Sequence, residues 1–386
     1  MKSTPDENPC LQGRQLGEDL GGSDLIAMDR DEQFNTRAWR QLASARVLRM
    51  CFPVSVGGDD GGTHARLVEV LRGLGQTCRD NGLLFALGAH LWACLYPISV
   101  FATHGQKALY LDRLMSGELI AAHAATEEPA GSDMGAIQTT ARKFSDRYVL
   151  TGTKSFITNA PIAGLFLVLA RIDESRGLTA FLVERESAGL KCSANIPKMG
   201  LRTAPMGTVE FLDCAIPLSS LLGEEGGGMA VLACAMELER MFMLAPAIGS
   251  MERLLQRSAE YSKARRQFGR PVISITQVRD RIVEIKRRIT CCHALLSSFA
   301  VRKDVGRFLG RESAMAKLQV SEAWIETCLD AMQIHGGKGY LVESEIEREL
   351  RDAIASRIYS GTPDVLRTAI ATFMRPSPAR PTRTCR

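Results

Sequence analysis

Apolar residues recur at helical spacing from about Asp24 to Leu119, with a glycine-rich interruption from Gly57 to Gly62. From about Ile120 to Leu222 the pattern changes to short runs rich in β-branched residues, such as RYVLTGTKSFIT and GTVEFLDCAIP. Helical periodicity returns from about Met229 to Phe373 and is broken at RRQFGRPV. We therefore predict an α+β protein in which helices precede and follow a small domain of antiparallel strands.

These changes of pattern predict the domain boundaries. We expect an N-terminal helical domain at 1–119, a middle β-domain at 120–225 and a C-terminal helical bundle at 226–374. Residues 375–386, RPSPARPTRTCR, have almost no apolar side chain whose burial would offset the entropy lost on ordering. We expect them to form a disordered tail.

Composition excludes several classes of protein. The 45% hydrophobic and 24% charged content over 386 residues is typical of a globular protein, and the net charge of +5 arises from interspersed charges, which disfavours nucleic acid as a partner. No run reaches the roughly eighteen apolar residues of a membrane span, and the start lacks a signal-peptide core, so a cytoplasmic location is expected. The eleven cysteines are scattered, which indicates reduced packing residues, and apart from the adjacent Cys292 and His293, which are too few for a metal site, none lies at zinc-ligand spacing from a histidine.

Two segments carry candidate chemistry. AATEEPAGSD, from Ala124 to Asp133, forms a turn rich in small and hydrogen-bonding residues, although a helix cap with a turn explains it equally well. GTKSFITNA places Thr158 and Asn159 at the end of a strand, where a hydroxyl and free backbone N–H groups are suited to face a planar ring. No glycine fingerprint follows a strand, so a dinucleotide, if bound, is not held by a Rossmann turn.

Taken together, in this order and spacing, the two segments resemble the acyl-CoA dehydrogenases. The resemblance continues through KMGLRTAPMGTVEFLDCAIP, LGEEGGG, YSKARRQFGRPVISITQ, QIHGGKGY, IERELRD and RIYSGT, and covers roughly residues 35–374. It implies the family fold, with an N-terminal α-domain, a middle antiparallel β-domain and a C-terminal four-helix bundle. It also implies that FAD lies between the last two domains and reaches a neighbouring subunit, so a homodimer or homotetramer is expected.

The resemblance assigns residues to FAD. It implies that the isoalloxazine ring is contacted by Ala125, Thr126, Phe156 and Thr158, with Thr158 of the ITN segment near the flavin N5. It implies that the pyrophosphate and adenosine are held, partly from a neighbouring subunit, by Arg265, Phe268, Gln333, Gly337 and Thr362. A guanidinium beside a pyrophosphate makes charge-assisted hydrogen bonds, although without the resemblance the Arg265 position is equally explained as one of a solvated basic pair.

The catalytic base departs from the family pattern. Most relatives carry YEGT in the last block, with glutamate as base, but this chain has Ser360 there, and a serine hydroxyl is far too weak a base. Glu239 lies in the apolar stretch LACAMELERMFMLAP, where a minority of the family, such as isovaleryl-CoA dehydrogenase, carries its base. The alternative is that Glu239 simply pairs with an arginine. Glu237 is predicted to lie on another, exposed face. Substrate contacts are expected from Ser132, Arg240, Tyr359 and Ser360.

A glutamate before Arg240, combined with SGT in the last block, is most similar to a subgroup of antibiotic biosynthesis that acts on carrier-protein thioesters, the prolyl carrier-protein dehydrogenases above all. This implies FAD-dependent α,β-dehydrogenation of an acyl or aminoacyl thioester tethered to an acyl or peptidyl carrier protein, with electron-transfer flavoprotein or oxygen as acceptor. The alternatives are a short or branched-chain acyl-CoA dehydrogenase of the isovaleryl type, a flavoprotein for non-thioester substrates, and a flavin-binding scaffold without catalysis.

Overall fold

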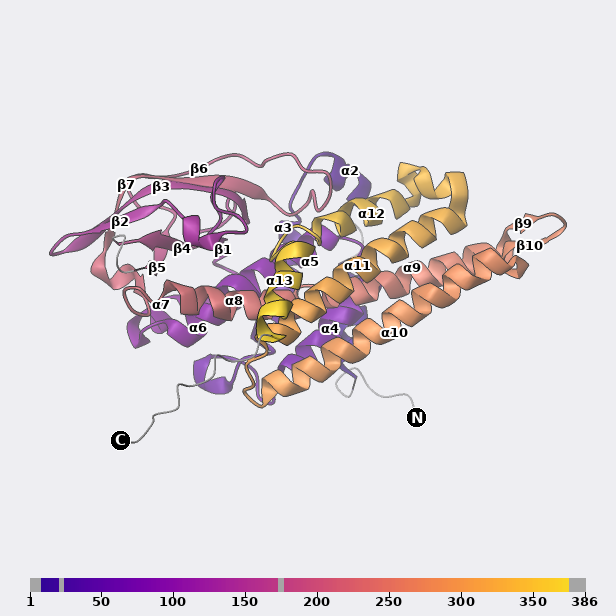
Figure 1. Ribbon diagram of the computed structural model, residues 1–386, viewed down its shortest axis with the longest axis horizontal. Coiled ribbons are helices and arrows are strands. Elements are labelled where there is room, and N and C mark those ends of the chain that lie inside the picture. Colours follow the sequence, from indigo (N-terminus) through magenta and orange to yellow (C-terminus); the bar gives the residue numbers. More distant parts are fainter. Residues whose placement is uncertain (1–7, 21–23, 173–176, 375–386) are drawn as a thin grey trace, which may run out of the picture.

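The computed structural model describes residues 8–20, 24–172 and 177–374, and the tail predicted at 375–386 lies outside them (Figure 1). Helices fill the first part of the chain: α1 Pro9–Asp19, α2 Leu25–Arg30, α3 Thr36–Ser44, α4 His64–Thr77, α5 Asn81–His90, α6 Tyr96–Phe101 and α7 His104–Met115. Polar caps begin several of them; the Asp80 carboxylate accepts from the Leu83 N–H at the start of α5, and Thr103 and Gln106 form a capping box on α7. The predicted helical region is confirmed.

Helices α5 and α6 join through a π-helical turn, Leu91–Leu95, into one apolar segment. Asn81–Phe101 is long and apolar enough to cross a membrane by length and composition alone, with a mean hydropathy of 1.7. However, 72% of its most apolar window is buried inside the protein, which is what the central helix of a folded domain requires. It gives no sign of a membrane protein.

The middle of the chain forms an eight-stranded sheet in the order β6-β7-β3-β2-β4-β5-β8, with β1 beside β4. The strands are β1 Ala121–Ala124, β2 Thr140–Lys143, β3 Arg147–Thr158, β4 Leu165–Arg171, β5 Leu178–Glu184, β6 Leu190–Cys192, β7 Met206–Pro217 and β8 Leu221–Leu222. Most pairings are antiparallel, as predicted, but β1 runs parallel to β4 throughout and β2 meets β4 in a single parallel pair. Strand β4 is apolar along most of its length because one face packs on the helices and the other lies inside the sheet domain.

Helices return after the sheet: α8 Gly228–Phe242, α9 Ala245–Ala264, α10 Thr276–Asp304, α11 Gly310–His335, α12 Ile346–Ala355 and α13 Pro363–Met374. The predicted break at RRQFGRPV is a small hairpin of β9 Arg266–Gln267 and β10 Arg270–Pro271, which projects from the end of the bundle farthest from the sheet (Figure 1). Helix α9 also crosses α4 closely, because a Cβ atom at Gly75 or Gly249 would overlap the opposite backbone. The arrangement of N-terminal helices, sheet and C-terminal helices confirms the predicted fold class.

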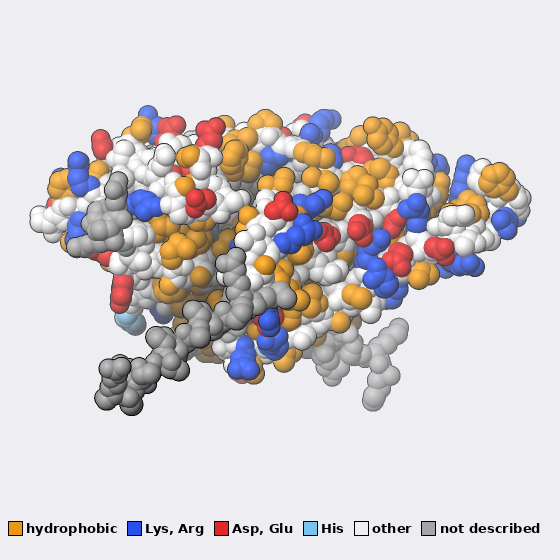
Figure 2. Space-filling model, viewed as in Figure 1, with side chains coloured by type: hydrophobic (Ala, Val, Ile, Leu, Met, Phe, Trp, Pro, Cys, Tyr) orange, Lys and Arg blue, Asp and Glu red, His pale blue; other side chains and the backbone are white. Residues whose placement is uncertain are grey.

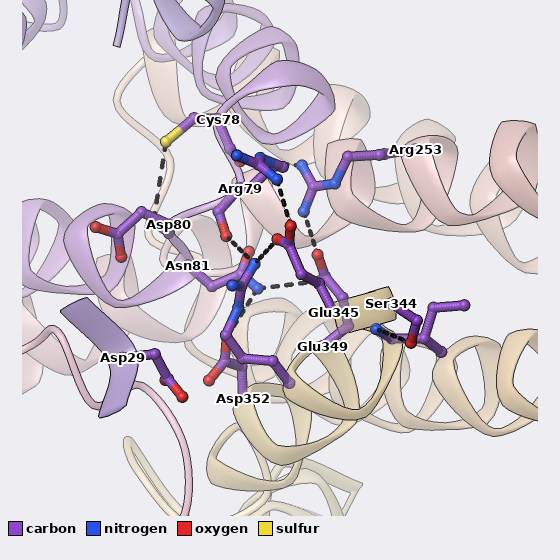
Figure 3. A network of polar contacts seen from close by, with 12 residues as sticks. Asp29, Cys78, Arg79, Asp80, Asn81, Arg253, Ser344, Glu345, Glu349 and Asp352 are labelled. Atoms are coloured by element: carbon purple, nitrogen blue, oxygen red, sulfur yellow. Dashed lines mark hydrogen bonds and ion pairs between the residues drawn. The ribbon is translucent and has the colours of Figure 1, made fainter. Parts of the chain in front are cut away.

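A buried polar network fastens the three parts of the chain together (Figure 3). The Asn81 amide of α5 donates to Glu349 Oε2 and Asp352 Oδ2 of α12, both at 3.0 Å. Asp352 Oδ1 accepts from the Leu201 N–H of the sheet domain at 2.6 Å, and Arg253 of α9 donates to Glu349 Oε1 at 2.5 Å. We name these five residues the domain lock. Their contacts give the sequence blocks KMGLRTAP and IERELRD a structural role, because Leu201 lies in the first block and Glu349 and Asp352 lie in the second.

Candidate active site

The segment after β1 lies along the last residues of β3. The Ser155 N–H donates to the Thr126 carbonyl at 2.9 Å, and Lys154 Nζ donates to the Ala125 carbonyl at 3.0 Å. Both bonds hold Ala125 and Thr126 beside the strand end that carries Thr158. The structure thus brings together the two segments to which the resemblance assigns the isoalloxazine.

A buried ion pair holds this wall, and sequence reasoning missed it. Lys154 is fully buried and its Nζ lies 2.8 Å from Glu127 Oε1. Glu127 also accepts from the Thr139 N–H at 2.9 Å and the Gln138 N–H at 2.6 Å. Burial alone would raise the pKa of Glu127, but the hydrogen bonds from Lys154 and Thr139 lower it overall, so the carboxylate stays charged. The signal available in the sequence was a lysine inside an otherwise strand-forming run.

The strand end itself is irregular. Pairing between β3 and β7 shifts register between Lys154 and Ile157, and Phe156 adopts a positive φ of 59° with 57% of its surface exposed. An apolar ring left open beside Thr126 and Thr158 suits stacking against a planar ligand. Asn159 does not fit the expectation of a free N–H, because its backbone N–H donates to the Pro205 carbonyl at 2.7 Å. The buried Asn159 is therefore a structural residue at the turn.

His123 is a second residue that sequence reasoning missed. Side chains alternate along β1, so His123 shares the face of Ala121 and Ala125, the face turned to the helices. Its Nε2 is buried without a hydrogen-bond partner in the described part of the chain, and burial lowers the pKa of its imidazole to about 4. A neutral ring nitrogen without a partner among the described residues is available to a bound heterocycle, and the exposed Phe156 ring lies on the neighbouring strand, so these residues fit a flavin.

Other residues assigned to FAD lie at the far end of the bundle. Arg265 follows the end of α9, and Phe268 lies in the turn of the β9–β10 hairpin, where it is 89% exposed. Gln333 and Gly337 are also exposed, at the end of α11, which lies beside the end of α9 because the Tyr261 and His335 rings stack at 4.4 Å. Within one chain this cluster is remote from the sheet (Figure 1), as expected if it serves a neighbouring subunit. Thr362 lies elsewhere, half-buried between α12 and α13.

Glu239 lies on α8 and is 7% exposed. Its Oε2 has no hydrogen-bond partner among the described residues. Burial raises its pKa to about 7, while the charges of Arg240 and Lys317 act in the opposite direction. The alternative of a simple arginine pair is not what the geometry shows, since Arg240 Nε donates to the Ser360 carbonyl at 3.0 Å.

The connection between α12 and α13 lies against this carboxylate. Ser360 has a positive φ of 53°, and Tyr359 packs on Phe85 with ring centres 4.6 Å apart. The structure thus brings Tyr359 within range of the charge of Glu239 and bonds Ser360 to Arg240, the residue after Glu239, so Arg240 links the two positions that compete for the role of base. Ser132 is exposed in the turn after β1, and no contact places it against Glu239.

The prediction that Glu237 is exposed is wrong. It does point to a different face from Glu239, but it is 4% exposed, with Oε2 2.8 Å from Lys303 Nζ and Oε1 accepting from the Leu309 N–H at 2.7 Å. The end of α10 and the start of α11 cover that face of α8. Helical periodicity assigns a side chain to a face but not the element that covers it.

Comparison with known proteins agrees with this architecture. Family profiles for the acyl-CoA dehydrogenase N-terminal, middle and C-terminal domains match residues 23–118, 122–214 and 226–374. L-prolyl-[peptidyl-carrier protein] dehydrogenase of Serratia sp. (strain ATCC 39006) is 37% identical over 356 residues, 89% of this chain and 92% of that protein. The crystal structure of the prolyl acyl carrier protein oxidase AnaB matches with a TM-score of 0.94 and 42% identity over 97% of this chain and all of that one. The structure of PigA with FAD and proline matches with a TM-score of 0.92 and 34% identity over 97% and 98%.

A helical domain, a sheet wall with an exposed aromatic ring and a helical bundle that buries Glu239, with one oxygen lacking a partner among the described residues, fit the flavoprotein dehydrogenases that the comparisons find. The chain belongs to the acyl-CoA dehydrogenase family. The resemblance stated from its motifs is confirmed.

Proposed function

We propose that this FAD-dependent dehydrogenase introduces an α,β double bond into an acyl or aminoacyl group, prolyl first, held as a thioester on a carrier protein in secondary metabolism. The observation that supports this is Glu239, a buried carboxylate on α8 whose Oε2 has no hydrogen-bond partner in the described part of the chain and which takes the place of the glutamate missing at Ser360. Similarity to a prolyl-carrier dehydrogenase and a prolyl carrier protein oxidase supports the substrate class. A cytoplasmic location accords with this role.

Glu239 has the properties that α-proton removal requires. No described residue bonds to its Oε2, which is therefore available to accept the proton, and a pKa raised to about 7 by burial makes the carboxylate a stronger base than an exposed glutamate. When bound, FAD accepts the hydride from the β-carbon. The Ala125–Thr126 segment, Phe156 and Thr158 would hold the flavin ring, and the Lys154–Glu127 pair fixes Ala125 beside β3.

A loaded carrier protein is expected to reduce the bound flavin at least about tenfold faster than the corresponding acyl-CoA, because an acidic carrier is steered to a positively charged protein. The measurement is anaerobic bleaching of the flavin with prolyl carrier protein and with prolyl-CoA at equal concentration. The difference in reduction rate between the two substrates should become smaller as salt is added. An acyl-CoA enzyme would show no such difference at any salt concentration.

The isovaleryl-type alternative fits less well, because isovaleryl-CoA dehydrogenase is a more distant relative. It predicts that a short branched acyl-CoA is turned over as fast as the loaded carrier, or faster. The acceptor is expected to be electron-transfer flavoprotein or oxygen, and oxygen uptake during turnover distinguishes the two.

A second subunit is expected to complete the cofactor site, with Arg265, Phe268, Gln333 and Gly337 holding the FAD pyrophosphate and adenosine across the interface. Apolar side chains gather in patches on the bundle face of Figure 2, and Leu329, Tyr340 and Ile358 are 49%, 77% and 68% exposed. Sizing should give a dimer or tetramer, and a monomer that retains FAD would contradict this.

Arg265→Ala should weaken FAD binding about ten- to a hundredfold, the scale of a lost charge-assisted hydrogen bond to an anion. FAD titration of the apoprotein measures it. Arg287→Ala on α10, whose exposed side chain pairs only with Glu284 among the described residues, is the matched control and should leave FAD affinity unchanged. Equal affinities for the two variants would remove Arg265 from the site.

A further inference from the structure

Lys317 of α11 is a fully buried cation beside the active site. Burial of an ammonium group is costly unless it is paired, yet no carboxylate in the described ranges lies within ion-pair distance of it. Its Nζ instead donates to the Ser356 carbonyl and lies 4.6 Å from the centre of the Tyr359 ring. Lys317 therefore requires an explanation other than a salt bridge.

Its partners belong to the segment that covers Glu239. The Ser356 carbonyl follows the end of α12, where helix carbonyls lack intrahelical partners and favour a cation. Four residues later the Ser360 carbonyl accepts from Arg240 at 3.0 Å. Two cations from different helices thus hold one short segment, Ser356–Ser360, against the base.

We propose that Lys317 is a positioning residue for Glu239, fixing the Ser356–Ser360 segment over the carboxylate and supplying the positive charge that keeps it ionised in a dry site. The proposal rests on the proposed role of Glu239 as base.

The charges around Glu239 favour this role. Burial raises the pKa of Glu239 to about 7 and lowers that of Lys317 to about 7, while the attraction between the two opposes both shifts. The other titratable groups facing Glu239 are Tyr359 and Cys94, and burial raises the pKa of each, so both are neutral. Among the residues that the structure describes, Arg240 and Lys317 supply the positive charge there. Loss of Lys317 must therefore raise the pKa of Glu239 further.

The direction of the pH effect follows. Glu239 accepts the α-proton only when ionised, so the rate of flavin reduction rises with pH through its pKa. Removing the Lys317 charge moves this rise to higher pH, which lowers the rate near neutrality and restores it in alkaline solution. A residue that only packs would lower the rate equally at every pH.

The test uses the FAD-loaded enzyme and measures flavin reduction by loaded carrier protein across the pH range. Lys317→Met should move the midpoint up by about one pH unit or more, equivalent to a roughly tenfold lower rate below the midpoint. Lys317→Gln keeps a donor for the Ser356 carbonyl without the charge; it should shift the midpoint equally, and it decides the matter if the methionine variant does not fold. Lys317→Arg keeps the charge and should stay near the wild-type midpoint.

Lys303→Met is the matched control, since Lys303 pairs with Glu237 on the other face of α8. It should reduce stability and leave the midpoint in place. A midpoint unchanged within about 0.3 units in both uncharged Lys317 variants overturns the proposal, because a single pKa unit is tenfold in ionisation. Glu239→Gln, measured in parallel, separates the failures: a wild-type rate there removes the base assignment itself.

Discussion

Glu239→Gln is expected to lower the rate of flavin reduction by about a hundredfold or more, the scale of a lost general base, while FAD remains bound. Glutamine keeps the size and hydrogen-bonding shape of the side chain but does not accept the α-proton. The effect belongs to the chemical step because Glu239 Oε2 is buried and has no structural partner in the described chain to lose. Anaerobic stopped-flow reduction by the loaded carrier measures it, with the flavin spectrum as the check on cofactor content.

Glu237→Gln provides a matched control two residues away on the same helix. Glu237 is buried to the same degree but is bound to Lys303 and the Leu309 N–H, so its loss should reduce stability and spare the rate of reduction. Ser360→Ala should cost much less than Glu239→Gln, since the Ser360 group that the structure uses is its carbonyl. A wild-type rate for Glu239→Gln would mean that the base lies elsewhere in the pocket.

Ser360→Glu in the Glu239→Gln background asks whether the usual family position still faces the α-carbon. Partial recovery of the rate is expected if it does, since Arg240, the residue after Glu239, bonds to the Ser360 carbonyl. An added carboxylate also fills space, so a bulky substrate would lose binding while a small thioester would not. Measuring the reduction rate with a carrier protein that bears a prolyl group and with one that bears a shorter acyl group separates these outcomes.

The order of helices, sheet and helices was predictable because hydrophobic periodicity is a local property of the chain. The parallel pairing of β1 with β4 was not, since AAHA is short, carries no alternation of polar and apolar residues and meets a strand some forty residues later. The polar network at Asn81, Glu349 and Asp352 likewise joins residues far apart in sequence. Glu349 and Asp352 appeared only in a family motif without a physical role, and Asn81 was not singled out at all.

A site residue could be predicted from the sequence where its polarity differed from that of the residues around it. Glu239 was a charge in an apolar run, and its burial followed from that pattern. Lys317 was missed because a lysine in a helix of mixed polarity looks like an exposed residue, and its partners Ser356 and Tyr359 come from another element. The predicted exposure of Glu237 failed for the same reason, since the covering helices are not encoded locally. Roles inferred for Ala125, Thr158 and the other cofactor residues stay predictions.

Arg253→Met is expected to lower the free energy of unfolding by about 3–5 kcal/mol, because it leaves the charge of Glu349 buried and without its closest partner. Arg253 Nη2 lies 2.5 Å from Glu349 Oε1, the two side chains are 9% and 1% exposed, and the same guanidinium also donates to the Cys78 carbonyl at 3.0 Å. Asn81 remains as a donor to Glu349 but carries no charge. Urea unfolding at fixed protein and saturating FAD concentrations measures the loss, since both ligand and association shift stability.

The double variant Arg253→Met, Glu349→Leu distinguishes an orphaned charge from lost packing. Replacing both partners of a buried ion pair with apolar side chains is often close to neutral, so much of the stability should return in the double variant although more contacts have been removed. Arg287→Met, which breaks the exposed pair with Glu284, should leave the unfolding midpoint almost unchanged. If the double variant is as unstable as Arg253→Met, the domain lock stabilises the fold through packing rather than through charge.

Glu349 lies one helical turn from Asp352, which binds the sheet domain through the Leu201 N–H. The single variant Arg253→Met should therefore also weaken the contact between sheet and bundle that the cofactor site requires.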